Sequence, residues 1–435
     1  MKKWFVIWIL GWGMLTAQAQ DTIRWSLQDC ITYAVTNNIT VKSAALNKQA
    51  AEINYQQQKN NKLPGFNGTT SLNASRGSSI DPITSDFVNK TILSNSYGLQ
   101  GSMVLYQGGR LNLQIDKNEL LVQQSELYQK EAENSITLNV TETYLQALYY
   151  QEGITIAENA VASSLEEVNQ AKVKYDKGAI AQKDLADIET QHSSNLYNVV
   201  SAKNMYAQQV LKLKQLLELD PAVRFQIEEV SLDNTEGDLP DLFTVYESAV
   251  QSLPDVKVFE LQSNILDKEL KIAKSGYLPS VSLNAGLNTG YTNTMEYNYF
   301  TQIYRNFSQQ AGVSVSIPIF SQKQNKTNIA LAKINLEQNE LSKISATKNL
   351  YAQVETAWQN ALANRAQQEA AKSARDNAKL AYDLARKKYD FGALTTTELA
   401  VSRNSYLNAE QTYLQSKYLA ELYRALLDFY QGKTI

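Results

Sequence analysis

Ala171-Lys-Val-Lys-Tyr-Asp-Lys-Gly-Ala-Ile180 recurs later in the chain as Ala385-Arg-Lys-Lys-Tyr-Asp-Phe-Gly-Ala-Leu394. The two copies lie 214 positions apart (385 − 171 = 214), and the match continues into Asp184-Leu-Ala186 and Glu398-Leu-Ala400. Similarity at a fixed offset indicates a repeated structural unit, so the sequence predicts two halves of roughly 200 residues with one architecture.

Shorter matches occur in the same order at nearly the same offset. Leu63-Pro64 corresponds to Leu278-Pro279, and Ser102-Met-Val-Leu-Tyr106 corresponds to Ser316-Ile-Pro-Ile-Phe320. Turn-forming residues are concentrated between the halves, which indicates a seam. The predicted organisation is a first repeat over 20–219, a linker over 220–242 and a second repeat over 243–435.

Long helices are predicted in both halves, because the chain has only 7 Pro and 18 Gly in 435 residues. One helical stretch runs from Ser26 to Asn61. Another runs from Gly109 to Tyr175 with Gly153 as its one candidate interruption, and 325–389 contains neither Gly nor Pro. A helix of sixty-odd residues spans ~100 Å. Each long helix is expected to form a hairpin, with tips at about 175–185 and 389–399.

Strands are predicted where apolar residues alternate strictly with Ser, Asn and Gly. The segments are about 66–75, 96–106, 280–291 and 309–319. Their length suits tilted transmembrane strands, and the uncharged polar face suits a watery interior. The long connections Ile80–Asn95 and Thr292–Ser308 then resemble extracellular loops. The alternative is a soluble hairpin that covers a core.

The N-terminus has the pattern of a secretory signal peptide over residues 1–19. Lys2 and Lys3 precede the apolar run Trp4–Leu15, and Ala17-Gln-Ala19 offers a cleavage site. The apolar run is shorter than the ~20 residues of a spanning helix, so a membrane anchor is the less favoured alternative. The chain is expected to be exported.

Composition argues against catalysis and against several ligand classes. Cys30 is the only cysteine and His192 the only histidine, which speaks against His-cluster metal sites and against Ser-His or Cys-His catalysis. No nucleotide-binding glycine fingerprint is present, so no cofactor is expected. A net charge of −3 gives no reason to expect a nucleic-acid partner. Cys30 is expected to be a small buried side chain on a helix.

Over nearly its whole mature length the chain resembles the TolC-like outer-membrane efflux family. The resemblance rests on the tandem halves, on Leu105-Tyr-Gln-Gly-Gly-Arg110 where a strand enters a helix, and on the twin motifs at 175–185 and 389–399. The second half departs at Phe320-Ser-Gln-Lys-Gln324, where Gly-Gly is absent, so the shape of that strand-to-helix corner is in doubt.

The resemblance implies a mainly α fold with a transmembrane β-barrel part. Four strands per chain would form one twelve-stranded barrel in a homotrimer, and long coiled-coil helices would form a periplasmic α-barrel. An oligomer is also expected on physical grounds. Four strands cannot close a barrel and eight give one filled by its own side chains, so a usable pore needs at least three chains.

The implied function is a passive channel in the outer membrane of a Gram-negative bacterium, extending into the periplasm. Such a subunit serves a tripartite efflux or type I secretion system. It docks a periplasmic adaptor protein and, through it, an inner-membrane RND or ABC transporter. The alternatives are a structural coiled-coil or adhesion protein without transport, and an enzyme that would have only scattered carboxylates to use. Five Met and one His give no sign of a copper or silver exporter, and drug efflux and protein secretion both remain open.

Candidate functional residues lie at the two hairpin tips. The resemblance implies an adaptor-docking tip formed by Gly178, Ala179, Ile180, Gly392, Ala393 and Leu394. It also implies a narrow periplasmic aperture formed by Tyr175, Asp184, Asp187, Tyr389 and Glu398. The residue one helical turn after Glu398 is Val401, so the second hairpin is expected to offer one acidic ring only. The alternatives are that Ile180 and Leu394 pack inside their turns, and that the acids are solvated charges at helix starts.

Overall fold

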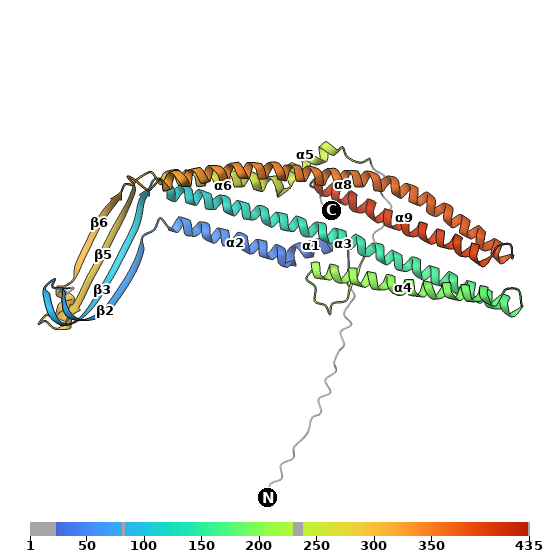
Figure 1. The fold of residues 1–435 in the computed structure, drawn as a ribbon, viewed down its shortest axis with the longest axis horizontal. Coiled ribbons are helices and arrows are strands. Elements are labelled where there is room, and N and C mark those ends of the chain that lie inside the picture. The colour runs from blue at the N-terminus through green and yellow to red at the C-terminus, as the bar shows by residue number, and fades with distance from the viewer. Residues whose placement is uncertain (1–22, 81–82, 229–237, 434–435) are drawn as a thin grey trace, which may run out of the picture.

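The computed structural model describes residues 23–80, 83–228 and 238–433. The predicted signal peptide therefore lies outside the described residues. The described chain is a long rod of helices with a curved sheet at one end (Figure 1). The helices are α1 Leu27–Asn37, α2 Ile39–Asn60, α3 Arg110–Asp176, α4 Gln182–Leu216, α5 Leu242–Ser252, α6 Pro254–Ser275, α7 Tyr299–Arg305, α8 Gln324–Asp390 and α9 Thr396–Tyr430. The strands are β1 Ile23–Trp25, β2 Gly65–Ile80, β3 Phe87–Gln107, β4 Phe225–Ile227, β5 Ser280–Thr292 and β6 Ser308–Ser316.

The helices of the two halves correspond in length. Helices α3 and α8 both have 67 residues, and α4 and α9 both have 35. Helices α1 and α5 both have 11 residues, and α2 and α6 both have 22. The tandem architecture that the repeated motif predicts is therefore confirmed, and so is the mainly α fold class with a small sheet.

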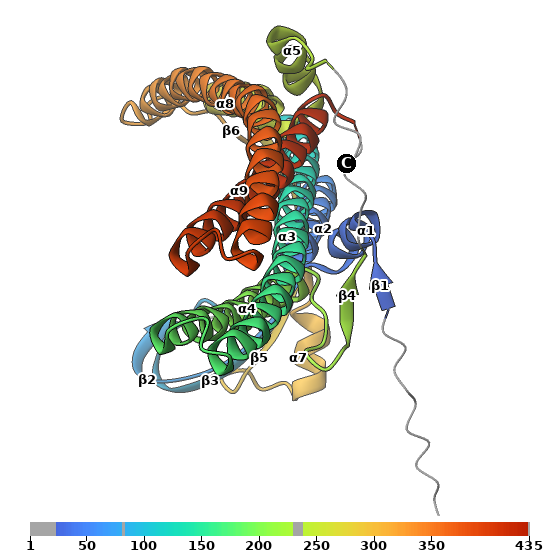
Figure 2. The same cartoon turned by 90° about the vertical axis from the view of Figure 1, so that its right-hand side faces the viewer.

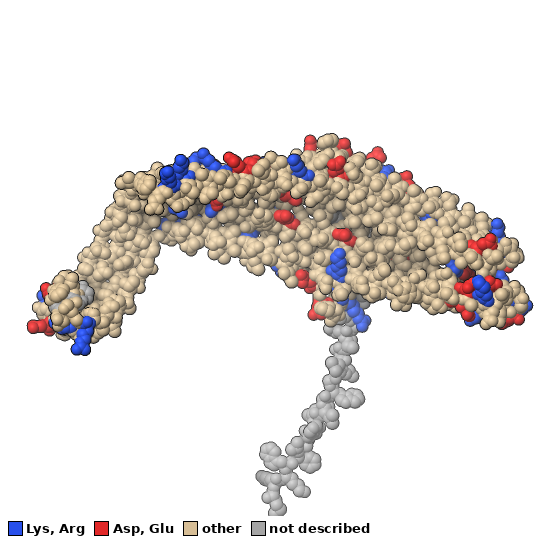
Figure 3. Space-filling model, in the orientation of Figure 1, with Lys and Arg blue, Asp and Glu red and all other residues tan. Residues whose placement is uncertain are grey.

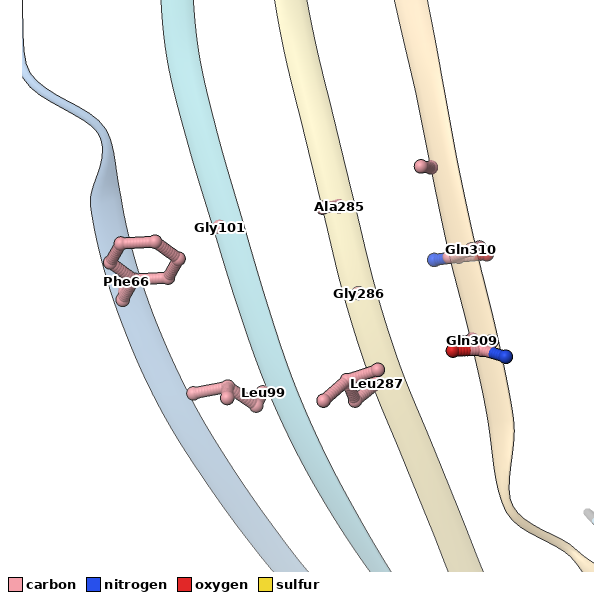
Figure 4. Close-up of a pocket in the computed structure, with 9 residues that line it drawn as sticks. Phe66, Leu99, Gly101, Ala285, Gly286, Leu287, Gln309 and Gln310 are labelled. Atoms are coloured by element: carbon pink, nitrogen blue, oxygen red, sulfur yellow. The ribbon is translucent and has the colours of Figure 1, made fainter.

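One antiparallel sheet holds four strands in the order β2-β3-β5-β6. The register places Phe66 opposite Gly101, and Leu99 opposite Leu287, on one face of the sheet. Figure 4 shows the Phe66 ring reaching toward Gly101, where an added Cβ would lie 2.8 Å from the ring. The opposite face carries Asn, Gln and Ser side chains. The alternation in the sequence therefore gives one apolar face and one polar face.

Three predicted boundaries are corrected by the structure. The stretch Ser26–Asn61 is two helices, because Asn38 leaves the helical conformation and its side chain caps α2 by accepting from the Thr40 amide at 2.8 Å. Gly153 does not interrupt α3. Strand β3 begins at Phe87, so most of the predicted loop Ile80–Asn95 belongs to the ladder. The β2–β3 pairing extends to Ile80 and Phe87, beyond the alternating apolar residues from which the strands were predicted.

Two short elements were not expected from the sequence. Strand β4 lies inside the predicted linker and pairs in parallel with β1. Helix α7 lies inside the predicted loop Thr292–Ser308 and packs against β5. The Tyr299 hydroxyl of α7 is 2.7 Å from the hydroxyl of Tyr97 on β3. Both elements are too short for a periodic pattern to reveal them.

The doubtful corner between β6 and α8 has the same backbone as its counterpart in the first half. Gly108 and Gly109 have φ values of 59° and 76°, in the left-handed region. Gln322 and Lys323, each 214 positions later, have φ values of 51° and 63°. The second corner is therefore made without glycine, at a cost of about 1–2 kcal/mol for each residue with a Cβ.

The long helices form an arc, and α1 and α5 lie on its convex side (Figure 2). Helix α1 packs on α3 and α4 through a buried cluster that includes Cys30, Tyr144 and Leu213. Cys30 is fully buried, as expected, and burial raises the pKa of its thiol to about 12. Helix α5 packs on α8 and α9 through a second cluster that includes Val245 and Val354. These contacts fix the middle of the rod.

Within residues 23–80, 83–228 and 238–433, no helix combines the length and the apolar character needed to cross a membrane.

Candidate functional site

The turn between α3 and α4 is a complete Schellman motif. The Gly178 amide donates to the Tyr175 carbonyl at 2.8 Å, and the Ala179 amide donates to the Lys174 carbonyl at 2.8 Å. Gly178 has φ +71°, where a side chain with a Cβ is strained. The glycine of the repeated motif therefore ends the helix as its sequence predicts.

The turn between α8 and α9 repeats this geometry. Gly392 also has φ +71°, and its amide donates to the Tyr389 carbonyl at 3.0 Å. The Ala393 amide donates to the Lys388 carbonyl at 2.8 Å. Both hairpins therefore close in the same way. The two tips lie together at the end of the rod that is farthest from the sheet (Figure 1).

The acidic residues after the turns cap the returning helices. Thr395 and Glu398 form a reciprocal capping box: the Glu398 amide donates to the Thr395 hydroxyl at 3.3 Å, and the Thr395 amide donates to the Glu398 carboxylate at 2.9 Å. The Thr395 hydroxyl, and then its backbone amide, lower the pKa of Glu398. In the first hairpin the Ala181 amide donates to Asp184, and Lys183 pairs with Asp187 at 2.6 Å.

A buried apolar cluster joins the two hairpins just behind the tips. We call it the tip cluster, and it consists of Val168, Ala171, Ile188, Tyr382, Tyr389 and Leu399. Ile180 and Leu394 are half-buried and pack against it. Ala179 and Ala393 are exposed. The tip residues chosen from the sequence therefore divide into two that support the fold and others that face solvent.

Phe391 is the residue at the tip that sequence reasoning missed. Its side chain is 88% exposed. It stands in the turn Tyr389-Asp-Phe-Gly392 where the first hairpin has Lys177. A comparison of the two copies of the motif could have found it, because the second copy has an aromatic residue where the first has a lysine.

A buried ionic group also links the hairpins. The guanidinium of Arg403 on α9 pairs with the Glu167 carboxylate on α3, and both side chains are only 5% exposed. The Tyr382 hydroxyl donates to Glu167 at 3.1 Å. Burial, and then the Glu167 charge, raise the pKa of Tyr382 to about 12, so the phenol remains a donor. Arg386 adds a partly exposed pair with Glu166.

The tyrosines of the twin motifs lie in different surroundings. Tyr389 is 5% exposed, and the Lys174 ammonium lies 4.2 Å from its ring centroid. Lys174 also donates to the Tyr389 carbonyl at 3.3 Å. Tyr175, the repeat equivalent, is 39% exposed. Of the residues predicted for the aperture, the structure brings Tyr389 and Asp184 to the junction of the hairpins, where Asp184 accepts from the Thr396 hydroxyl at 3.3 Å.

In the three described ranges no group of three or more His, Cys, Asp and Glu side chains is arranged to hold a metal ion.

Comparison with known proteins agrees with the duplicated architecture. The family described as outer membrane efflux protein matches residues 31–218 and again 245–432, and both bounds differ by 214 (245 − 31 and 432 − 218). The outer membrane protein TolC of Vibrio cholerae is 22% identical over 330 residues, covering 75% of this chain and 70% of its own length. The cation efflux system protein CusC of Escherichia coli O6:H1 is 23% identical over 412 residues, covering 90% and 82%.

The fold is shared with solved structures. A crystal structure of CusC superposes with a TM-score of 0.80 at 20% identity, covering 95% of this chain and 93% of that one. At this identity the match concerns the fold. The matched relatives are outer membrane channel proteins rather than enzymes.

Proposed function

Because this chain belongs to the outer membrane efflux protein family, we propose that it is the outer-membrane channel subunit of a tripartite efflux or type I secretion system. Three copies form a passive duct in the outer membrane of a Gram-negative bacterium, with the rod in the periplasm. The duct receives cargo from an inner-membrane transporter through a periplasmic adaptor. The observation that carries the proposal is that the described residues leave two unpaired edges, one on each side of the sheet and of the row of helices that continues it.

The first edge consists of β2 and α2, and the second consists of β6 and α8. Strands β2 and β6 end the sheet, so each has one side with no strand partner among the described residues. Contacts along the rod follow the order α2-α3-α6-α8. Helix α2 exposes Ile39, Leu46 and Ile53 at a spacing of seven. Helix α8 exposes Leu331, Ile334, Leu341 and Ile344. Joining the second edge of one copy to the first edge of the next is a head-to-tail contact that closes into a ring.

Ring closure also accounts for the different exposure of Tyr175 and Tyr389 in a single chain. Within one chain, Tyr389 of the second hairpin is covered by the first hairpin, which supplies Lys174. Tyr175 on the first hairpin has no such neighbour among the described residues. In a ring, the second hairpin of the next copy would lie beside it, and the repeat makes Lys388 the equivalent of Lys174. Both tyrosines would then be covered.

The polar face of the sheet supports the role of a passive duct. A shallow hollow on this face is lined by residues that include Asn67, Gln100, Ser102, Asn284 and Ser314. A sheet that closes with this face inward gives a water-filled interior of low charge, while the apolar face meets lipid. The chain itself then needs no energy source.

The exposed Phe391 supports adaptor docking at the tip. An exposed aromatic side chain at the far end of a rod favours association with a partner surface. Beside Phe391, the backbone lies close to the surface because the turns consist of small residues, Gly178, Ala179, Gly392 and Ala393. In this proposal Phe391 anchors the adaptor, whereas Ile180 and Leu394 support the turns from inside.

Replacing Phe391 with Ser is expected to weaken binding of the purified cognate adaptor by about tenfold or more, because burial of a Phe side chain contributes roughly 1.5–3 kcal/mol. Surface plasmon resonance with the assembled channel measures the change. The matched control is Lys177→Ser at the equivalent position, which should have a smaller effect. Equal binding by Phe391→Ser and wild type would show that Phe391 is not part of the docking surface.

The aperture proposal concerns Glu398. Glu398→Gln is expected to lower cation preference in planar bilayer recordings, while the amide preserves the capping box. Since the pKa of Glu398 lies below its ordinary value of 4.5, the carboxylate stays charged and the preference should persist as pH falls from 7 toward 4.5. Glu369→Gln, on the exposed surface of α8, is the control. An unchanged selectivity in Glu398→Gln would mean that this carboxylate acts only as a helix cap.

A further inference from the structure

The corner at the start of α8 holds a lysine in an unfavourable backbone conformation. Lys323 has φ 63°, and its repeat equivalent in the first half is Gly109 with φ 76°. A glycine would adopt this conformation without strain, because it has no Cβ. Strained residues persist where the surrounding structure holds them, and they cluster at functional sites.

The equivalent corner in the first half has room for a side chain at its second position, Gly109. A Cβ on Gly108 would lie 2.7 Å from the Leu278 Cβ, whereas a Cβ on Gly109 would meet nothing within 4 Å. Lys323 occupies the position that corresponds to Gly109, and it is exposed. Its long cationic side chain is therefore free to reach into the surroundings of the corner.

The sequence around Lys323 carries charge of a single sign. Residues 297–336 contain Arg305, Lys323, Lys326 and Lys333 but no Asp or Glu. The three lysines are exposed, and none of them forms an ion pair with a described residue. Figure 3 shows basic side chains gathered over the start of α8. We call Lys323, Lys326 and Lys333 the lysine patch.

Two lysines of the patch, Lys326 and Lys333, lie on the side of α8 that faces away from the concave side of the arc. Lys333 precedes Tyr351 by 18 residues, which is five turns of an α-helix, so both point to the same side of α8. The Tyr351 ring packs against Tyr246 of α5 at 5.3 Å between centroids. Helix α5 lies on the convex side of the arc (Figure 2). Lys326 is one heptad before Lys333 and shares nearly the same direction.

The lysine patch begins where the apolar surface of the sheet end stops. Ile317, Ile319 and Phe320 are 66%, 96% and 78% exposed. Lys323 follows three residues later. An outward apolar band followed at once by lysines is the arrangement expected where a protein leaves the hydrocarbon layer and meets charged headgroups.

We propose that the lysine patch binds the phosphate groups of anionic phospholipids in the periplasmic leaflet of the outer membrane. The inference rests on the proposed placement of the sheet in that membrane. Each lysine near an anionic lipid surface contributes about fivefold in affinity. Lys323 keeps its strained conformation because glycine would remove the charge closest to the apolar band.

The test uses the assembled full-length channel in detergent, with dioleoylphosphatidylglycerol as the probe. Thermal unfolding is followed as lipid is added, and the half-saturating concentration is read from the rise in midpoint. The triple variant Lys323→Gln, Lys326→Gln, Lys333→Gln is expected to raise that concentration about tenfold or more. The matched control, Lys130→Gln, Lys212→Gln, Lys372→Gln, removes three exposed lysines that lie farther from the sheet than the lysine patch, and it should leave the half-saturating concentration unchanged.

Two single variants separate charge from backbone strain. Lys323→Gly should raise the unfolding midpoint without lipid and reduce the response to phosphatidylglycerol. Gln322→Gly relieves the neighbouring strain and keeps the charge, so it should raise the midpoint and preserve the response. Loss of the response in Gln322→Gly as well would show that the corner acts through its shape, and the proposal would be overturned.

Further arms of the test identify the ligand and the face. Phosphatidylcholine and inorganic phosphate should give little response, and a response to phosphate equal to that of the lipid would contradict lipid binding. Single-channel conductance of the triple variant should match wild type. A changed ion selectivity with an unchanged lipid response would place the lysines in the lumen. Failure of the wild-type protein to conduct at all would instead reject the proposed channel function.

Discussion

Replacing Arg403 with Met is expected to destabilise the tip end of the rod by about 3–5 kcal/mol, because it leaves the Glu167 carboxylate buried without its cation. Glu167 and Arg403 are each 5% exposed, and Tyr382 would be the remaining donor to the carboxylate. The same group joins the hairpin α3/α4 to the hairpin α8/α9. We therefore also expect a larger and noisier single-channel conductance, since the hairpins at the proposed aperture would move more freely.

Thermal unfolding of the assembled protein and bilayer recordings measure the two effects. Lys203→Met is the control, because Lys203 and Glu158 form an exposed pair at 2.7 Å that should contribute about 1 kcal/mol or less. A loss of stability in Arg403→Met no greater than in this control would contradict the structural role of the buried pair.

A double variant separates the loss of the ionic link between the hairpins from the effect of leaving the Glu167 charge unpaired. Combining Glu167→Leu with Arg403→Met removes both charges, and replacing a buried ion pair with apolar groups is often neutral or stabilising. The double variant should therefore recover stability relative to Arg403→Met alone. Persistent high conductance in it would show that the ionic link itself restrains the hairpins.

The second large effect is expected at the seam between copies. Leu46→Asp combined with Ile53→Asp should prevent trimer formation, because the exposed apolar stripe of α2 would place two carboxylates against α8 of the next copy. Each apolar side chain would otherwise contribute roughly 1.5–3 kcal/mol on burial. Native mass spectrometry of the detergent-extracted protein should show monomers.

The matched control is Asn47→Asp combined with Asn54→Asp, which adds the same charge on a face of α2 about 100° away. These variants should remain trimeric. Circular dichroism checks that both pairs keep their helices. Trimers from the Leu46→Asp, Ile53→Asp protein would show that α2 does not line the contact between copies.

The sequence by itself determined the repeated architecture and the local geometry of the turns. The offset of 214 positions reappears in α3 and α8 and in α4 and α9, because helix length depends on where the breaking residues stand. Gly178 and Gly392 adopt the left-handed backbone that ends a helix, and alternation gave the two faces of the sheet. These features depend on neighbours in the chain, so a local pattern is sufficient to predict them.

Only the tertiary structure decided which of two equivalent residues is buried and which is exposed. The twin motifs contain the same tyrosine, but Tyr389 is enclosed by the other hairpin while Tyr175 is not. The partnership of Glu167 with Arg403 joins residues 236 positions apart, and no pattern in either segment reveals it. Lys323 adopts a glycine-like backbone because the strand and helix on either side require that turn. Burial, long-range pairing and strain depend on what the rest of the fold places beside a residue, and a local sequence does not contain that information.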